Sequence, residues 1–275
     1  MAGGIFGFDA FSPREVAARI ETIGVAKARM PLRTTLMLAV LAGGFIGLGS
    51  IAFLLVASDP ALSFAVSRTL GGAVFSLGLI MVVVAGAELF TGNNLLAMAW
   101  AEGKVGTREL LRNWVLVCLG NLAGAGALAA LVLLADTAAL NGGLIAQKAV
   151  EVAGAKAALA WDVAFFRGAL CNVLVCLAIW MAAAGRSVTD KVIAIVPPIA
   201  AFVALGFEHS IANMFFFPLA IGLLALDASL LALPGADAIG WLAMTRNLAP
   251  VIAGNLLGGS VLVALVYWVI YRRKP

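Results

Sequence analysis

The amino-acid sequence is poor in charge and in side chains that bind metals. Charged residues make up 12% of its 275 positions, hydrophobic residues make up 63%, and there is a single histidine. Soluble domains contain about a quarter charged residues, so this composition is typical of a membrane protein. A metal site needs several clustered ligands, which one histidine and three separated cysteines do not supply. We therefore expect no metal, no other cofactor and no nucleic-acid partner.

The hydrophobic residues fall into six long segments. About 20 residues of α-helix cross a hydrocarbon core of about 30 Å, and each segment is long enough to do so. None of them shows the alternation of a barrel strand. The pattern therefore predicts an all-α membrane protein with six transmembrane helices. The segments are approximately residues 34–57, 68–100, 111–135, 160–184, 190–226 and 248–271.

Positive charges are unevenly distributed over the connections between these segments. Arginine and lysine are frequent at both termini and in the second and fourth connections, and infrequent in the others. By the positive-inside rule both termini are predicted in the cytoplasm, which agrees with an even number of crossings. We divide the chain into an amphipathic N-terminal segment lying on the membrane surface (1–33), one transmembrane domain (34–271) and a short cytoplasmic tail (272–275). The third connection (136–161) is expected outside the membrane.

Two of the six segments, 68–100 and 190–226, are too long for one straight crossing. The first contains Gly86-Ala-Glu-Leu-Phe-Thr-Gly-Asn93 and the second Gly206-Phe-Glu-His-Ser-Ile-Ala-Asn213. Glycines and polar residues in the middle of a membrane helix favour a broken helix whose irregular backbone lines a cavity. We therefore predict that the second and fifth transmembrane helices are broken.

The two halves of the chain resemble each other. The two polar runs carry glycine, glutamate and asparagine at identical spacings, and the following segments match at Gly120-Asn-Leu-Ala-Gly124 and Gly254-Asn-Leu-Leu-Gly258. Residues 34–135 and 160–271 are thus predicted to be two copies of one unit. Because each copy has three crossings, the copies must have opposite orientations in the membrane. Inverted repeats with paired broken helices are typical of a transport site near the midplane.

The single histidine, His209, lies in the second polar run beside Glu208. A titratable group at this depth is costly and usually faces a cavity or pathway. A lone histidine can also be a packing residue, but the matching break favours a functional role. Glu88 and Glu208 could supply the carboxylates of an intramembrane enzyme. Their equivalent positions suggest instead that they accept hydrogen bonds from the backbone or the histidine and hold the breaks, with Asn93 and Asn213, so we expect no enzymatic activity.

Three motifs resemble those of the formate/nitrite transporter family. They are Ala87-Glu-Leu-Phe-Thr-Gly-Asn93, Arg167-Gly-Ala-Leu-Cys-Asn172 and Gly206-Phe-Glu-His-Ser-Ile-Ala-Asn-Met214, and the resemblance covers all six segments. It implies an aquaporin-like bundle that assembles as a homopentamer in the bacterial cytoplasmic membrane, with one pore in each subunit. The substrates it implies are small monovalent anions: formate, nitrite, hydrosulfide and other short monocarboxylates.

The resemblance also assigns roles to individual residues. His209 resembles the central pore histidine and Thr91 its hydrogen-bond partner, the pair implied in a proton relay. Asn172 and Asn255 resemble the polar groups that flank this pair, and Lys156 resembles a lysine that attracts anions to the outer vestibule. The apolar constrictions on the two sides of the histidine are implied at Phe75, Leu79, Leu89, Phe90, Val175 and Phe202.

The physical obstacle to passage is the loss of hydration when an anion enters an apolar ring. We expect Lys156 to attract the anion and His209 to share or donate a proton, so that the solute crosses as the neutral acid. The sequence leaves open whether the imidazole donates a proton or only stabilises charge. It also leaves open whether Arg167, within the fourth segment, reaches the interface or pairs with Glu88 or Glu208. The alternative functions are an aquaporin-like channel for neutral solutes, whose Asn-Pro-Ala motifs are absent, and a membrane-embedded sensor or enzyme subunit.

Overall fold

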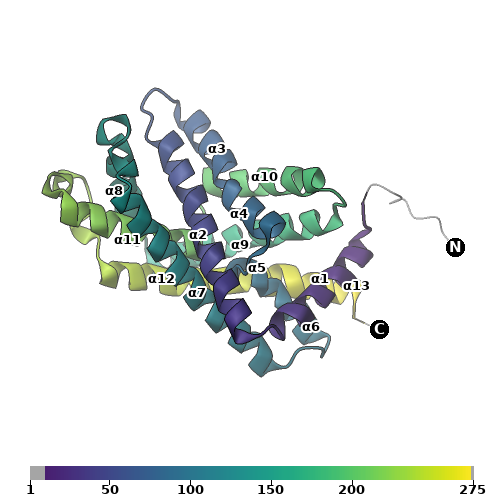
Figure 1. Ribbon diagram of the computed structural model, residues 1–275. Helices are drawn as coiled ribbons and strands as arrows, with labels where there is room; N and C mark the ends of the chain where they lie inside the picture. The colour runs from purple at the N-terminus through teal and green to yellow at the C-terminus, as the bar shows by residue number, and fades with distance from the viewer. Residues whose placement is uncertain (1–9, 274–275) are drawn as a thin grey trace.

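The computed structural model describes residues 10–273. These residues form helices, with no strand apart from an isolated bridge between Ala10 and Gly185 (Figure 1). The prediction of an all-α fold is therefore confirmed for this part of the chain. Residues 1–9 of the predicted N-terminal segment and residues 274–275 of the predicted tail lie outside it.

The first half of the described chain contains one helix that precedes the repeats and all the elements of the first repeat. They are α1 (Pro13–Ala28), α2 (Leu32–Ala57), α3 (Phe64–Phe75), α4 (Leu77–Met81), the π-helix η1 (Val82–Gly86), α5 (Phe90–Asn93), the 3₁₀ turn η2 (Asn94–Leu96), α6 (Ala97–Ala101) and α7 (Thr107–Leu134).

The second half contains a connecting helix and the second repeat. Its elements are the 3₁₀ turns η3 (Thr137–Ala139) and η4 (Asn141–Gly143), α8 (Leu144–Ala157), α9 (Trp161–Ala184), α10 (Val188–Ala204), α11 (Ser210–Leu226), the 3₁₀ turns η5 (Ala228–Ala232) and η6 (Ala236–Ala238), α12 (Trp241–Leu256), the π-helix η7 (Leu257–Leu265) and α13 (Val266–Tyr271).

Five helical stretches within residues 10–273 are long and apolar enough to cross a membrane. The fifth predicted segment is instead divided between α10 and α11, which have 17 residues each. The predicted count of six crossings therefore depends on taking these two helices together. The five long stretches are Leu32–Ala57, Phe64–Gly86, Thr107–Leu134, Trp161–Ala184 and Trp241–Tyr271.

Both predicted breaks are present. After η1 the chain turns at Gly86, whose φ is +88°, and runs extended through Leu89 before α5 begins. After α10 it turns at Gly206, whose φ is +71°, and runs extended to His209 before α11 begins. A left-handed φ is accessible to glycine at little cost, which explains why each polar run starts with one. The prediction that the second and fifth segments are broken is confirmed.

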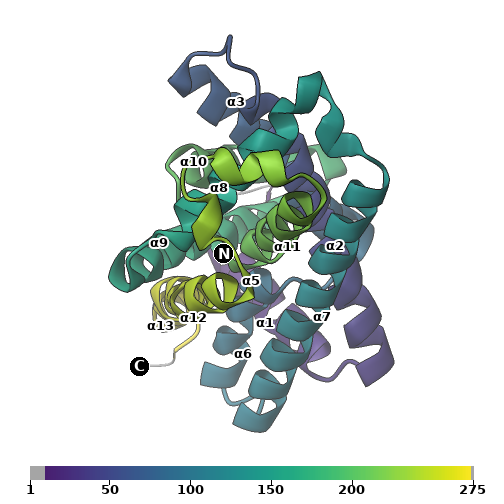
Figure 2. The same ribbon diagram turned by 90° about the vertical axis from the view of Figure 1, so that its left-hand side faces the viewer.

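The two copies of the inverted repeat contain equivalent pairs of packed helices. In the first copy α2 packs along α7, in the second α9 packs along α12 and η7, and α3 packs against α10 between the copies (Figure 1, Figure 2). Equivalent glycines permit close approaches of the paired helices in both copies. A β-carbon placed on Gly124 would lie 1.9 Å from the Val40 carbonyl oxygen, and one on Gly258 would lie 2.1 Å from the Ala169 carbonyl oxygen.

Substitution of Gly124 by alanine is expected to destabilise the protein by about 1–3 kcal/mol, because the added methyl group overlaps the backbone of α2. Gly126 is the matched control on the same helix, since a β-carbon there meets no atom within 4 Å. Alanine at that position should be neutral or slightly stabilising, as expected in a helix. The midpoint of thermal unfolding in detergent measures both effects, and equal midpoints for Gly124→Ala and Gly126→Ala would contradict the packing argument.

The N-terminal segment, expected on the membrane surface, and the third connection, expected outside the membrane, both contain packed helices. Residues 136–161 contain α8, which buries Ile145, Ala149 and Ala153 and packs against α11. The N-terminal segment contains α1, which packs on η2 and α6 rather than lying free of the bundle. Glu21 of α1 is 2% exposed and pairs with Lys104 and Arg272. These two helices bring Lys27 and Lys156 to the breaks.

Candidate functional site

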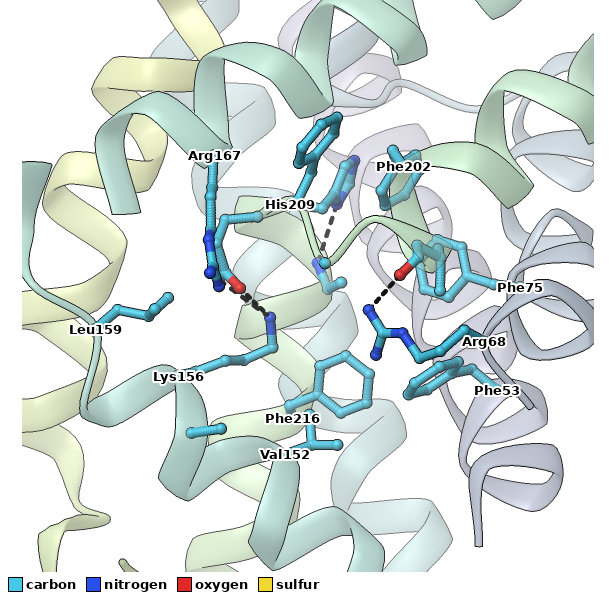
Figure 3. A pocket seen from close by; sticks show the side chains of 16 residues that line it. Phe53, Arg68, Phe75, Val152, Lys156, Leu159, Arg167, Phe202, His209 and Phe216 are labelled. Atoms are coloured by element: carbon cyan, nitrogen blue, oxygen red, sulfur yellow. Dashed lines mark hydrogen bonds and ion pairs between the residues drawn. The ribbon is translucent and has the colours of Figure 1, made fainter. Parts of the chain in front are cut away.

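Two cavities reach the breaks. The first, here called the Lys156 vestibule, has a volume of about 200 Å³, and the His209 side chain forms part of its wall (Figure 3). Its charged lining residues are Arg68, Lys156, Arg167 and Glu208. Its other lining residues are Phe53, Phe75, Val152, Ala155, Leu159, Phe202, Val203, Gly206, Phe207, Ala212 and Phe216.

The second cavity, here called the Lys27 vestibule, has a volume of about 520 Å³. Leu89 in its wall occupies the position in the first break that His209 occupies in the second. The helices that carry the two lysines, α1 and α8, lie at opposite ends of the molecule (Figure 1). The charged residues that line the Lys27 vestibule are Arg19, Lys27, Glu88 and Lys191. The apolar residues that line it include Leu38, Val82, Leu89, Leu96 and Ile179.

His209 is the residue that precedes α11, and it is 3% exposed. Its Nδ1 accepts a hydrogen bond of 3.1 Å from the Ala212 backbone N–H, which makes it the N-cap of the helix. An imidazole nitrogen that accepts a hydrogen bond carries no proton, so the neutral ring has its proton on Nε2. Nε2 lies 3.1 Å from Thr91 Oγ1. The histidine therefore donates this bond to the threonine hydroxyl, and the pair joins the two breaks.

Aromatic side chains line the Lys156 vestibule beside this pair. The rings of Phe75 and Phe202 meet edge to face with centroids 5.6 Å apart, and Phe202 stacks on His209 at 5.8 Å. Leu89 borders the other vestibule. The remaining residues assigned to the constrictions line neither vestibule and are buried in the core around them; they are Leu79, Phe90 and Val175.

A polar network holds the second break. Lys156 Nζ lies 2.9 and 3.0 Å from the two carboxylate oxygens of Glu208. Asn213 Nδ2 donates to Glu208 Oε2 and to Asn247 Oδ1, both at 2.7 Å. Asn247 in turn donates to the Lys156 carbonyl oxygen at 3.0 Å. The glutamate is 5% exposed and its lysine 13%, so this is a nearly buried ion pair.

The first break has an equivalent network, with a further hydrogen bond of 2.8 Å from Lys27 Nζ to Asn93 Oδ1. Lys27 Nζ lies 2.9 Å from Glu88 Oε1, and Asn93 Nδ2 donates to Glu88 Oε2 at 2.7 Å and to Asn113 Oδ1 at 2.9 Å. Asn113 donates to the Lys27 carbonyl oxygen at 3.2 Å. Lysine, glutamate and both asparagines thus have equivalent partners in the two copies. Among the described residues the donors to the two carboxylates are lysine and asparagine side chains, not the backbone or histidine groups expected from the sequence.

Two further asparagines clamp the extended backbone of the breaks. Asn255 donates to the carbonyl oxygens of Gly168 and Glu208 at 2.8 and 3.0 Å and accepts from the Ser210 N–H at 3.1 Å. Asn121 donates to the carbonyl oxygens of Ala39 and Glu88 at 2.7 and 2.9 Å, and it accepts from the Phe90 N–H at 2.9 Å. These bonds satisfy backbone groups that a broken helix leaves unpaired, which explains the buried asparagines.

Asn172 supports the histidine's partner. Its Nδ2 lies 3.2 Å from the Thr91 carbonyl oxygen, 2.7 Å from Asn94 Oδ1 and 2.7 Å from the Asn255 carbonyl oxygen. The residue is fully buried and lines neither vestibule. In this structure it positions Thr91 and does not face a cavity.

A model of the formate/nitrite transporter family matches residues 14–269. The chain belongs to this family. It is 38% identical to the formate channel FocA of Escherichia coli (strain K12), over 97% of this chain and 96% of that one. It is 35% identical to a probable formate transporter of Methanothermobacter thermautotrophicus, over 96% of this chain and 98% of that one.

Solved structures show the same relationship for this family member. A pentameric formate channel with formate bound superposes with a TM-score of 0.81 and 39% identity, covering 88% of this chain and 98% of that one. An FNT family ion channel superposes with a TM-score of 0.79 and 32% identity, covering 96% and 98%. The all-α fold of this family is confirmed, apart from the exact count of six crossings, and the relatives are named as channels and transporters.

The sequence prediction missed part of the polar frame of this transporter-family chain. Lys27, Asn113 and Asn247 were not assigned to the site, and Asn121 was not given the role of its equivalent Asn255. A signal existed, because Asn113 precedes Asn121 by the same spacing as Asn247 precedes Asn255.

Arg167 forms no hydrogen bond or ion pair through its side chain with any residue that the structure describes. Glu208 pairs with Lys156 and Glu88 with Lys27 instead. The arginine side chain lies in the Lys156 vestibule (Figure 3). Neither of its predicted carboxylate partners is therefore available to it.

Proposed function

We propose that this chain passes formate and related small monovalent anions, including nitrite and short monocarboxylates, across a membrane. The path runs from the Lys156 vestibule past the His209–Thr91 pair to the Lys27 vestibule. One observation carries this proposal. The two vestibules meet the two breaks at equivalent positions, and the His209–Thr91 hydrogen bond lies where the breaks meet. The names of the relatives, formate channels and a probable formate transporter, support the same substrate class.

Both vestibules favour an anion over a neutral solute. Each is lined by three cationic side chains and one carboxylate, so each has a net positive charge. Clefts with apolar walls and one sign of charge raise the local concentration of counter-ions. An aquaporin-like channel for neutral solutes has no need of this charge. We assign the chain a channel or transporter role and no enzymatic turnover.

At the centre, His209 can act on the anion through Nε2. An anion that replaces Thr91 Oγ1 as the acceptor receives the Nε2–H hydrogen bond while the imidazole stays neutral. Full proton transfer needs the imidazolium form, for which Nδ1 must release the Ala212 N–H. We propose that passage is linked to protons through this histidine, with Thr91 as its relay partner and Asn172 and Asn255 as positioning residues.

We further propose a homopentamer with one pore in each subunit, both termini in the cytoplasm and the bacterial cytoplasmic membrane as the location. The pentameric formate channel that this chain resembles supports the oligomeric state. The positive-inside distribution of arginine and lysine supports the orientation.

Uptake into proteoliposomes tests the function. The purified protein should accelerate entry of formate, and of nitrite and hydrosulfide in parallel assays, over protein-free liposomes, and an inward proton gradient should increase the rate. Swelling with glycerol should match that of protein-free liposomes. Rapid glycerol swelling without formate uptake would favour the neutral-solute alternative and overturn the proposal.

A further inference from the structure

The positive charge of Lys156 is neutralised by an ion pair and is not available to an anion in the Lys156 vestibule. Lys156 is within 3.0 Å of both carboxylate oxygens of Glu208 and is 13% exposed. Lys27 has the equivalent pairing with Glu88 in the other copy. A pair that recurs in both copies belongs to the frame of the breaks, and its charges largely cancel at a distance.

Two guanidinium groups remain uncompensated in this vestibule. Arg68 donates from Nε to the Ala204 carbonyl oxygen at 3.2 Å and from Nη2 to the Val203 carbonyl oxygen at 2.5 Å. Since a guanidinium has five N–H donors, others stay available. The side chain of Arg167 has no hydrogen bond or ion pair among the described residues. Figure 3 shows the two arginines on opposite sides of the same cavity, with Lys156 between them.

The inverted repeat shows that the fold does not need Arg167. The Glu208 N–H donates to the Arg167 carbonyl oxygen at 3.2 Å, and the Glu88 N–H donates to the Leu38 carbonyl oxygen at 3.2 Å. Arg167 and Leu38 are therefore equivalent, and each lines its own vestibule. A cation within a predicted membrane segment, at a position where the other copy has leucine, is expected to have a function. Arg167 is exposed and lines the cavity, where an anion can reach it.

The chemistry of the cavity selects the ligand. Guanidinium groups bind planar two-oxygen anions through paired hydrogen bonds, which an ammonium group cannot do. The walls of the cavity also include the apolar side chains of Phe53 and Phe216.

We propose that Arg167, together with Arg68, forms an anion-capture site that holds a planar two-oxygen monoanion, a carboxylate or nitrite, before it reaches His209. The site rests on the proposed function and assigns to the arginine pair the attraction expected from Lys156. Arg68 also donates hydrogen bonds to the last turn of α10, so its substitution would affect folding as well as anion binding. Substitution of Arg167 tests anion binding alone.

Formate uptake into proteoliposomes at low ionic strength tests the site. Arg167→Gln should raise KM for formate roughly tenfold, the scale of electrostatic focusing in a cleft, and leave the maximal rate unchanged. Arg167→Lys, which keeps the charge, should restore the dependence of KM on salt but not the full affinity for formate. Hydrosulfide cannot accept paired hydrogen bonds from a guanidinium group. The KM for hydrosulfide should therefore differ between Arg167→Lys and the wild type much less than the KM for formate. Arg167→Leu introduces the residue found at the equivalent position and guards against a folding defect in Arg167→Gln.

Lys148→Gln is the matched control, because Lys148 is a cation paired with Glu151 that lines a neighbouring cavity and not this vestibule. It should leave KM unchanged. A KM for formate within twofold of the wild type in Arg167→Gln and Arg167→Leu, in preparations that transport formate, would overturn the inference.

Equilibrium binding separates this inference from the proposed function. Saturation-transfer NMR with ¹³C-formate and protein in lipid nanodiscs should detect binding that Arg167→Leu weakens by a similar factor. Binding that depends on Arg167 in a protein without transport would support the capture site and refute passage. Transport by a protein whose formate binding is unaffected by Arg167→Leu would refute the capture site and leave passage intact.

Discussion

Replacement of His209 by leucine is expected to lower formate uptake roughly 10- to 100-fold without unfolding the protein. The imidazole Nε2–H lies between Phe202 and Leu89 and donates a hydrogen bond to Thr91. An anion can replace Thr91 as the acceptor of this hydrogen bond. A hydrogen bond to a charged group contributes about 1.5–3 kcal/mol, and about 1.4 kcal/mol is tenfold in rate. Leucine already occupies the equivalent position, Leu89, so the backbone of a break accepts it.

The measurement is the initial rate of ¹⁴C-formate uptake into proteoliposomes, with the thermal midpoint of each variant recorded in detergent. Lys148→Gln, which lies outside both vestibules, controls for reconstitution. Uptake by His209→Leu at the wild-type rate, in a protein of normal thermal midpoint, would show that the histidine does not act on the anion.

His209→Asn separates charge stabilisation from proton transfer. Asparagine is a good N-cap, so its Oδ1 can accept the Ala212 N–H in place of Nδ1, while its Nδ2 falls short of Thr91. It keeps the contact that caps α11 and cannot be protonated. We expect this variant either to pass formate without regard to the proton gradient or to lose passage. Uptake that still follows the proton gradient as in the wild type would refute proton linkage through His209.

The sequence was sufficient to predict the breaks and the inverted repeat, because both depend on local chemistry. Gly86 and Gly206 adopt left-handed φ values, and the glutamates and asparagines that follow them at equal spacing hold the extended backbone. Such requirements recur wherever a membrane helix is broken, so they are visible as a repeated pattern.

The partners of the buried glutamates could not be predicted in the same way. Glu208 could have paired with Arg167 or Lys156, and only the packing of α8 against α11 brings Lys156 to it. Since α8 is short and rich in alanine, hydropathy did not distinguish it from a connection. Because Glu208 pairs with Lys156, Arg167 has no carboxylate partner in the vestibule. The proposed capture site depends on this pairing.

Glu208→Gln is expected to destabilise the protein by about 3–5 kcal/mol, the usual cost of leaving one member of a buried ion pair alone. Glutamine can still accept the Asn213 hydrogen bond, so the effect isolates the unpaired charge of Lys156. Glu88→Gln should cost less, because Lys27 is 26% exposed against 13% for Lys156 and water screens it better.

The thermal midpoint in detergent measures this difference between the two copies. Adding Lys156→Met to Glu208→Gln should recover much of the loss, since a neutral pair of similar volume leaves no charge uncompensated. Equal midpoints for Glu208→Gln and the wild type would mean that the pair does not hold the break. In that case the charge of Lys156 would be available to an anion, and the capture role given to Arg167 would have to be shared with it.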